Sequence, residues 1–281
     1  MPAEITAIER LLKGGKLKVR RSPLWERICD ENGVGQVIGR EIHFTPEDRQ
    51  RLRDYVKAEH NLDPQYDSRT GGRMVMARKD ASEKLSRDSV FGHLLVMATA
   101  GRTTIRSSGE EVTTPPGSVL SVLPEHLDIA HLQSRKLVII ENGALMPFWA
   151  DLQLTGSWQD AIILYRGHRE NMRFVADIAR EQPAQNLAWF FDFDPAGQAM
   201  ALDQGRGSTL VPEAWSTFDK GTAYNQPGTY RNQTAALKRL KARASGELLK
   251  VAEHLGTEEL ALMQEHLVLR QVRLKALPVI L

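Results

Sequence analysis

The chain has 281 residues, of which 42% are hydrophobic and 26% are charged, and its formal net charge at pH 7 is +2. These values are typical of a soluble globular protein with one large domain or two modest ones; no apolar run approaches the roughly 18 to 20 residues of a membrane-spanning helix, and the charged N-terminal stretch lacks the apolar segment of a secretory signal. The single cysteine, Cys29, excludes an internal disulfide and a cysteine-rich zinc site, so we expect a cytoplasmic protein with a reduced thiol.

The first part of the chain predicts an accessory α+β region over residues 1–130. Residues 3–13 have the spacing of an amphipathic helix, and a second helix begins after the N-cap Thr45 and runs to about His60. Within residues 103–122, strand-forming residues alternate with turn residues, a pattern that indicates β-structure. A small winged helix from about residue 80 is one arrangement that this mixture would allow.

The middle of the chain predicts a parallel sheet covered by helices over residues 131–231. Four short apolar runs are typical of buried strands: 137–140, 161–165, 187–191 and 208–211. Helical patterns cover 169–181 and about 195–202. Polar residues concentrate directly after the strands, at the carboxyl edge where open α/β sheets bind ligands.

Residues 232–281 are rich in Leu, Ala, Lys, Arg and Glu, and they predict a helical extension that packs on the sheet. Gly246 and Gly256 divide this segment into two or three helices. The expected architecture is therefore an α/β domain with an α+β region before it and helices after it.

Three carboxylates are expected at the carboxyl edge of the sheet. Asp192 and Asp194 are separated by one residue on extended backbone, so both side chains point the same way. Two adjacent buried anions repel each other, and a divalent cation such as Mg²⁺ relieves that repulsion. Glu141, at the end of an earlier parallel strand, supplies a third carboxylate.

These residues carry a resemblance to a known fold. An apolar strand ending in Glu141, followed by an apolar strand ending in Asp192-Phe193-Asp194, resembles the Toprim fold of topoisomerases, bacterial primases and several nucleases. The string DFDPAG at 192–197 is similar to the A subunit of topoisomerase VI and Spo11-like proteins. With VIIEN at 138–142 and YRGH at 165–168, it also resembles the nuclease subunit of Wadjet plasmid-defence systems. The resemblance covers about 135–215.

The resemblance implies a Mg²⁺-dependent (or Mn²⁺-dependent) DNA endonuclease, in a plasmid-defence complex or an SMC-like chromosome-maintenance complex. The partners of this protein would be DNA and the other subunits of the complex, and a homodimer is a further arrangement that the resemblance allows. No membrane is implied. Glu141, Asp192 and Asp194 would hold the metal, with Glu141 as general base or second-metal ligand and His168 near the phosphate or leaving group. Further candidate contacts to phosphate or DNA are Asn142, Arg166, Lys238 and Arg239.

Four alternatives stay open. The topoisomerase VI branch cuts DNA through a tyrosine, for which Tyr55 and Tyr66 are the upstream candidates. A haloacid dehalogenase-like phosphatase would use Asp192 as nucleophile and Asp194 as acid, but no second acidic pair follows on a later strand. The chain would otherwise be a non-catalytic DNA-binding subunit. Finally, an Asp-x-Asp string is also typical of a structural turn in which one side chain caps the next helix.

Two basic clusters and several aromatic residues also have two interpretations. The residues of the two basic clusters are Lys13, Lys16, Lys18, Arg20 and Arg21, and then Lys238, Arg239, Lys241 and Arg243. Such clusters contact phosphates in some proteins, but they are more often solvated faces. Trp215, Tyr224 and Tyr230 are expected to pack over the helices, with base stacking as the alternative.

Overall fold

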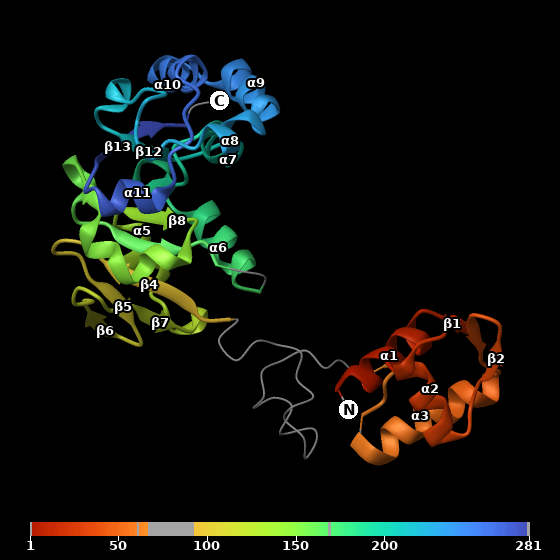
Figure 1. Cartoon of the computed structure of the whole chain (residues 1–281). Coiled ribbons are helices and arrows are strands. Elements are labelled where there is room, and N and C mark those ends of the chain that lie inside the picture. The colour runs from red at the N-terminus through yellow and green to blue at the C-terminus, as the bar shows by residue number, and fades with distance from the viewer. Residues whose placement is uncertain (1, 61, 67–92, 168–169, 280–281) are drawn as a thin grey trace. The chain divides into compact units, whose positions relative to one another are not determined.

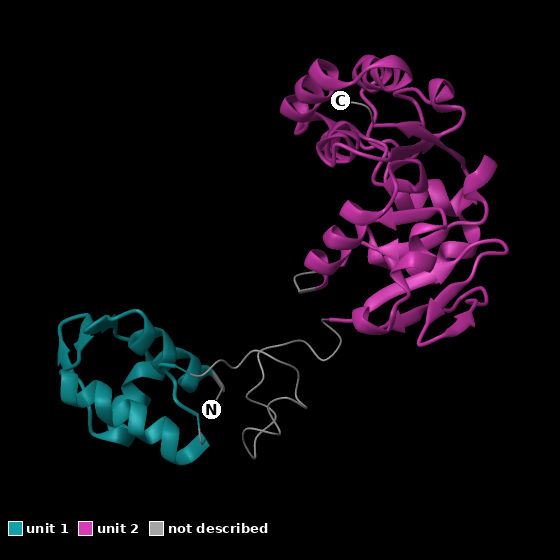
Figure 2. Cartoon of the chain, turned by 180° about the vertical axis from the view of Figure 1, so that it is seen from behind, with its two compact units in different colours: residues 1–91 teal, residues 92–281 magenta. Residues whose placement is uncertain are grey.

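The computed structural model describes residues 2–60, 62–66, 93–167 and 170–279 (Figure 1). The chain divides into two compact units, an N-terminal unit of residues 1–91 and a C-terminal unit of residues 92–281 (Figure 2). Each unit has its own hydrophobic core. No helix in the described part of the chain has the length and apolar composition needed to cross a bilayer.

The N-terminal unit contains helices on a small antiparallel sheet. Its elements are α1 (Pro2–Lys13), β1 (Lys18–Arg20), α2 (Pro23–Asn32), β2 (Gln36–Ile38), β3 (Glu41–His43) and α3 (Pro46–His60). The strands lie in the order β1-β3-β2. The expected α+β character is confirmed for this unit. The winged helix suggested from about residue 80 begins in 67–92, outside the described residues.

Local sequence signals explain the two helices expected in this unit. The apolar face of α1 is buried as its spacing predicts, with Ile5, Ile8, Leu11 and Leu12 in the core. At the start of α3, the Thr45 N–H donates to Asp48 Oδ2 (2.9 Å) and the Asp48 N–H donates to Thr45 Oγ1 (3.1 Å). This reciprocal pair satisfies two backbone donors and fixes where α3 begins.

Cys29 is a buried, free thiol in α2. Burial, reinforced by Asp30 and Asp48, raises the pKa of this thiol to about 11. The thiol is therefore protonated at neutral pH, and it lacks the thiolate character of a reactive cysteine. The expectation of a reduced structural thiol agrees with this environment.

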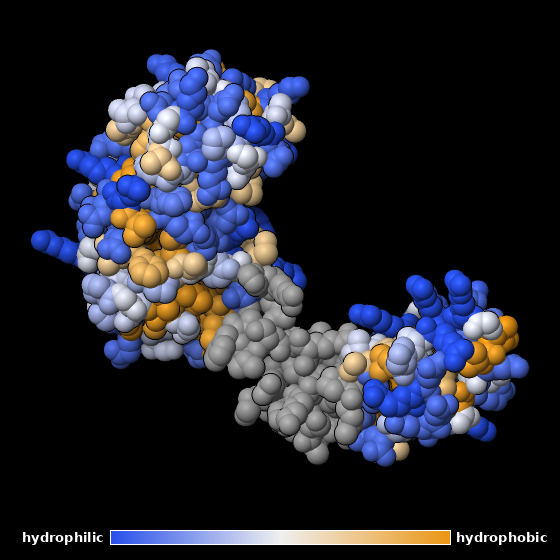
Figure 3. All heavy atoms as spheres, in the orientation of Figure 1, coloured by the Kyte–Doolittle hydropathy of each residue, from blue (hydrophilic) through white to orange (hydrophobic). Residues whose placement is uncertain are grey.

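Strand β2 forms an exposed apolar edge of the N-terminal unit. Val37 and Ile38 are 51% and 52% exposed. Figure 3 shows both hydrophobic and hydrophilic side chains on the visible face of the N-terminal unit. Two basic side chains of the first basic cluster have acidic partners: Lys18 pairs with Glu41, and Arg21 pairs with Glu26. The charge of this surface is thus more balanced than the sequence run alone indicates.

The C-terminal unit is a mixed α/β domain. Its strands are β4 (Leu95–Thr99), β5 (Ile105–Ser107), β6 (Glu110–Val112), β7 (Leu120–Val122), β8 (Leu137–Ile140), β9 (Gln153–Leu154), β10 (Ile162–Tyr165), β11 (Leu187–Phe190), β12 (Ser208–Pro212) and β13 (Arg273–Pro278). Its α-helices are α5 (Ile129–Gln133), α6 (Glu170–Glu181), α7 (Pro195–Asp203), α8 (Pro227–Arg231), α9 (Thr234–Arg243), α10 (Gly246–Thr257) and α11 (Gln264–Leu269). Eight strands form one sheet in the order β7-β4-β10-β8-β11-β12-β13-β9.

The centre of this sheet is parallel, as the sequence predicts. β8 pairs in parallel with β10 on one side and with β11 on the other, and β11 pairs in parallel with β12. Successive residues of β8 alternate between two cores: Val138 and Ile140 lie in one, and Leu137 and Ile139 in the other. All four are fully buried, because helices cover both faces of the sheet.

The domain boundary expected near residue 130 differs from the one observed. β4 and β7 precede that residue, yet β4 pairs with β10 and β7 pairs with β4, so both belong to the central sheet. The compact unit consequently begins at residue 92.

The C-terminal segment is also not wholly helical, as the sequence suggested, because its last described element is a strand. β13 pairs antiparallel with β12 over five residues. Its Leu, Lys and Ala residues favour helices in isolation, and the pairing with β12 overrides that propensity. The extension is therefore part of the domain and not an addition to it.

Candidate functional site

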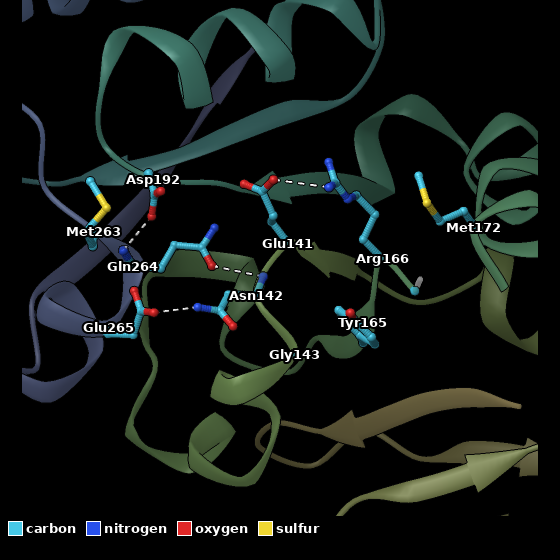
Figure 4. Close-up of a pocket in the computed structure, with 11 residues that line it drawn as sticks. Glu141, Asn142, Gly143, Tyr165, Arg166, Met172, Asp192, Met263, Gln264 and Glu265 are labelled. Carbon is cyan, nitrogen blue, oxygen red and sulfur yellow. Dashed lines mark hydrogen bonds and ion pairs between the residues drawn. The ribbon is translucent and has the colours of Figure 1, made fainter. Parts of the chain in front are cut away.

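Three strand ends meet at one pocket of about 600 Å³. Glu141 follows β8, Arg166 follows β10, and Asp192 comes two residues after β11. The Glu141 N–H donates to Phe190 O (3.1 Å) and the Arg166 N–H donates to Ile140 O (2.8 Å), so both backbones continue the sheet's hydrogen bonds. Figure 4 shows the Glu141 side chain between those of Asp192 and Arg166, as the strand order requires. The expectation that Glu141 and Asp192 share one sheet edge is confirmed.

Glu141 is partly buried and has a cationic neighbour. Arg166 Nη2 lies 3.1 Å from Glu141 Oε1. Burial raises the pKa of Glu141; the charge of Arg166 opposes that effect, and the charge of Asp194 adds to it. A glutamate whose pKa is raised in a pocket is suited to accept and release a proton.

Asp192 has the most strongly raised carboxyl pKa in this pocket. Its Oδ1 accepts a hydrogen bond from the Gln264 N–H (2.8 Å). Burial raises the pKa of Asp192 from 3.8 to about 6, the Gln264 hydrogen bond lowers it, and the charges of Asp194, Glu141 and Glu265 raise it further. The negative charges thus repel one another within the pocket, and a cation bound there would relieve that repulsion.

Asp194 has a structural position. It is 2% exposed and does not line the pocket. Its Oδ1 accepts from the Gly197 N–H (2.6 Å) as the N-cap of α7, and its Oδ2 accepts from Gln233 Nε2 (2.6 Å). Both carboxylate oxygens therefore already have donors. The capping interpretation of the Asp-x-Asp string holds for this second aspartate.

Two of the three predicted cation ligands, Glu141 and Asp192, line this pocket. Among the residues that the structure describes, no group of three or more His, Cys, Asp or Glu side chains is placed to hold a metal ion. The pair Glu141 and Asp192 is joined in the lining of the pocket by a third carboxylate, that of Glu265. Mg²⁺ is commonly bound by one or two carboxylates together with water and substrate phosphates, so this pair fits that cation.

The sequence did not indicate the contribution of α11. Gln264 is 1% exposed: its Nε2 donates to Phe190 O (2.8 Å) and its Oε1 accepts from the Asn142 N–H (3.3 Å). Asn142 Nδ2 in turn donates to Glu265 Oε1 (2.5 Å). Gln264 and Glu265 hold together the ends of β8 and β11. No local motif could identify them, because they are more than seventy residues from Asp192 in the sequence.

The remaining candidate residues are His168, Lys238 and Arg239. His168 is outside the described residues. Lys238 and Arg239 are exposed on α9 and do not line the pocket, and Arg239 lies 3.8 Å from Asp203. The aromatic residues pack, as expected: Trp215 and Tyr224 lie against the core, and Tyr230 Oη donates to Gly256 O (3.1 Å).

The two candidate tyrosine nucleophiles belong to the N-terminal unit. Tyr55 packs against the core of that unit from the middle of α3, and burial raises the pKa of its phenol. Tyr66 is 72% exposed, with the Arg53 guanidinium 5.0 Å from its ring centroid. A raised phenol pKa opposes formation of the nucleophilic phenolate at Tyr55.

Comparison with known families places this domain. Residues 92–276, about two thirds of the chain, match the family model described as "Domain of unknown function (DUF7281)". The chain belongs to the DUF7281 family. The matched segment begins at the first residue of the C-terminal unit, so the DUF7281 domain and this compact unit coincide. A comparison with curated proteins found no match.

The raised pKa of Asp192 in this DUF7281 domain predicts a pH-dependent stability. The pKa of Asp192 is about 6 in the folded state and 3.8 in the unfolded state, so protonation of Asp192 stabilises the folded protein. This stabilisation is fully present below pH 3.8 and is lost as the pH rises through about 6. We expect Asp192→Asn to melt at a higher temperature than wild type at about pH 8 without divalent cations, and the difference to vanish below about pH 3. Thermal melts across that range test this. A difference that does not change with pH would contradict the assigned pKa.

The turn after Asp192 predicts that Gly197→Ala destabilises the DUF7281 domain. A Cβ at this position would clash with the Asp192 carbonyl oxygen, and neither backbone can move without disturbing the Asp194 cap. We expect a loss of about 1–3 kcal/mol in the free energy of unfolding, measured by denaturant titration. Gly228→Ala in α8 is the matched control, because its added Cβ meets nothing within 4 Å. If the two variants were equally stable, the backbone of Gly197 would not lie close to the Asp192 carbonyl oxygen.

Proposed function

We propose that this protein is a divalent-cation-dependent DNA endonuclease whose cation lies between Glu141 and Asp192. The observation that carries the proposal is the convergence of these two carboxylates at the ends of parallel neighbouring strands, in a pocket that also contains Arg166. Both carboxyl pKa values are raised, by burial first and by neighbouring acidic groups in addition. Neighbouring carboxylates whose pKa values are raised in this way are typical of sites that take up a cation.

Each residue of the pocket has a distinct part in this proposal. Glu141 and Asp192 would hold Mg²⁺ or Mn²⁺, which when bound polarises a phosphodiester and lowers the pKa of a water molecule. Glu141 would also accept the proton of the attacking water, for which its raised pKa is suited. Arg166 would contact a non-bridging phosphate oxygen. Asp194 would position Asp192 by fixing the turn into α7.

The Toprim assignment is part of the same proposal. Its support is the parallel order β10-β8-β11-β12, with a glutamate after β8 and an aspartate after β11. DNA as the substrate, and membership of a plasmid-defence or SMC-like complex, rest on the resemblance of the motifs. Lys238 and Arg239 remain candidate DNA contacts on α9.

The direct test is incubation of the full chain with supercoiled plasmid and Mg²⁺ or Mn²⁺, with chelator as control. We expect nicked or linear product only when the cation is present. A cation-dependent release of phosphate from a small phosphomonoester, without plasmid cleavage, would instead favour a phosphatase. Binding of the plasmid with no product under any cation would mean a non-catalytic DNA-binding subunit.

A further inference from the structure

Arg166 is the positively charged side chain nearest to Glu141 among the described residues of the pocket. Its backbone is fixed to β8 by the hydrogen bond to Ile140 O, and its guanidinium lies 5.8 Å from the Phe191 ring centroid. Nη2 contacts Glu141 Oε1 at 3.1 Å. The arginine is therefore held at the side of Glu141 opposite Asp192 (Figure 4).

This guanidinium is incompletely bonded. Within the described residues, Arg166 Nε is buried and has no hydrogen-bond partner. Its contact to Glu141 uses one nitrogen, although a guanidinium can donate to two oxygens of one carboxylate or phosphate in parallel. Because a buried unpaired donor is unfavourable, the observed contact leaves Arg166 able to gain from a second oxyanion.

The charges of the pocket set up a competition for Glu141. Among the described residues that line it, three carry carboxylates (Glu141, Asp192 and Glu265) and one, Arg166, carries a positive charge. A divalent cation bound by Glu141 and Asp192 would repel Arg166 and would take over the negative charge that now attracts it. Arg166 and the divalent cation therefore cannot both make full use of the Glu141 carboxylate.

We propose that Arg166 acts as an exchangeable counter-ion: it holds Glu141 when no divalent cation is bound, and it transfers to a phosphodiester oxygen of the substrate when the cation takes that carboxylate. This inference rests on the proposed function. It makes the binding of the cation a precondition for full phosphate recognition. Loading of the cation and of the DNA is then coupled through one side chain.

The test measures binding and not cleavage. Calorimetric titration of the full chain with Mn²⁺ compares wild type, Arg166→Gln and Arg166→Lys, with Arg180→Gln as control because Arg180 pairs with Asp177 on the exposed side of α6. We expect Arg166→Gln to bind Mn²⁺ about ten-fold more tightly, since the competing cation is gone, and Arg180→Gln to match wild type. Arg166→Lys keeps the charge and should not gain affinity.

A second measurement follows the released arginine. Fluorescence anisotropy with a short labelled DNA duplex is recorded with and without Ca²⁺, a cation that carboxylates also bind. Wild type should bind the duplex about ten-fold more tightly with Ca²⁺ present, and Arg166→Gln should lose that increase. Circular dichroism melts verify that each variant is folded.

The outcomes separate the two claims. Weaker or unchanged Mn²⁺ binding by folded Arg166→Gln would overturn the exchange, because Arg166 would then support Glu141 or play no part in cation binding. An increase with Ca²⁺ that survives Arg166→Gln would overturn it as well. A wild-type chain that binds neither Mn²⁺ nor Ca²⁺ would instead remove the proposed function from which the exchange follows.

Discussion

Replacement of Asp192 by Asn is expected to lower the rate of cation-dependent DNA cleavage by about a hundred-fold or more. The substitution removes one of the two carboxylates that would hold the cation. The Asn side-chain oxygen can still accept the Gln264 N–H, so the turn and its link to α11 should persist. The loss would therefore be one of charge at the reaction site and not of structure.

The measurement is the initial rate of plasmid nicking in Mg²⁺ and in Mn²⁺ at equal protein concentration. Asp177→Asn is a suitable control, because this aspartate is on α6, does not line the pocket and pairs with the exposed Arg180. Asp192→Asn protein that cuts as fast as wild type would show that Asp192 does not hold a required cation.

Replacement of Asp194 by Ala is expected to lower the free energy of unfolding by about 2–4 kcal/mol. Loss of the N-cap of α7 accounts for about 1 kcal/mol, and the Gln233 amide left without its acceptor accounts for most of the rest. Asp194→Asn keeps an oxygen for the Gly197 N–H and should lose less. Urea titration of the full chain measures these differences in the C-terminal unit.

Asp128→Ala provides the matched comparison for this stability effect. Asp128 also caps a helix, since its Oδ1 accepts from the His131 N–H (2.9 Å) at the start of α5, but its carboxylate is partly exposed. We expect a cost of about 1 kcal/mol there. If the Asp194→Ala variant cost no more than Asp128→Ala, the bond to Gln233 would be unimportant. The structural assignment of Asp194 would then weaken.

The sequence predicted the centre of the fold because that part is determined locally. Leu137–Ile140 is wholly apolar and β-branched in three of its four positions, a pattern that favours a short strand buried on both faces. A parallel sheet then brings Glu141 and Asp192 to the same edge without further information. The order of apolar strands and acidic residues in the sequence was thus enough to predict where Glu141 and Asp192 lie.

The role of Asp194 could not be settled in the same way. The string from Asp192 to Gly197 is compatible both with two cation ligands and with one ligand followed by a helix cap. The choice depends on Gln233, which reaches Asp194 from the start of α9 nearly forty residues later. Periodicity carries no information about such a contact.

Long-range pairing explains the remaining differences. β13 has helix-favouring residues and becomes a strand through its ladder with β12. The same C-terminal segment places Gln264 against Asn142 and Asp192. The extension expected to pack on the sheet therefore completes both the sheet and the pocket.

Binding of Mn²⁺ to the full chain, followed by electron paramagnetic resonance, tests the claim on which the proposal depends. The signal of free Mn²⁺ should fall as wild-type protein is added, and the double variant Glu141→Gln, Asp192→Asn should leave it unchanged while remaining folded. The Asp177→Asn protein should behave as wild type. Equal uptake of Mn²⁺ by the folded double variant and by wild type would mean that these two carboxylates do not form the cation site.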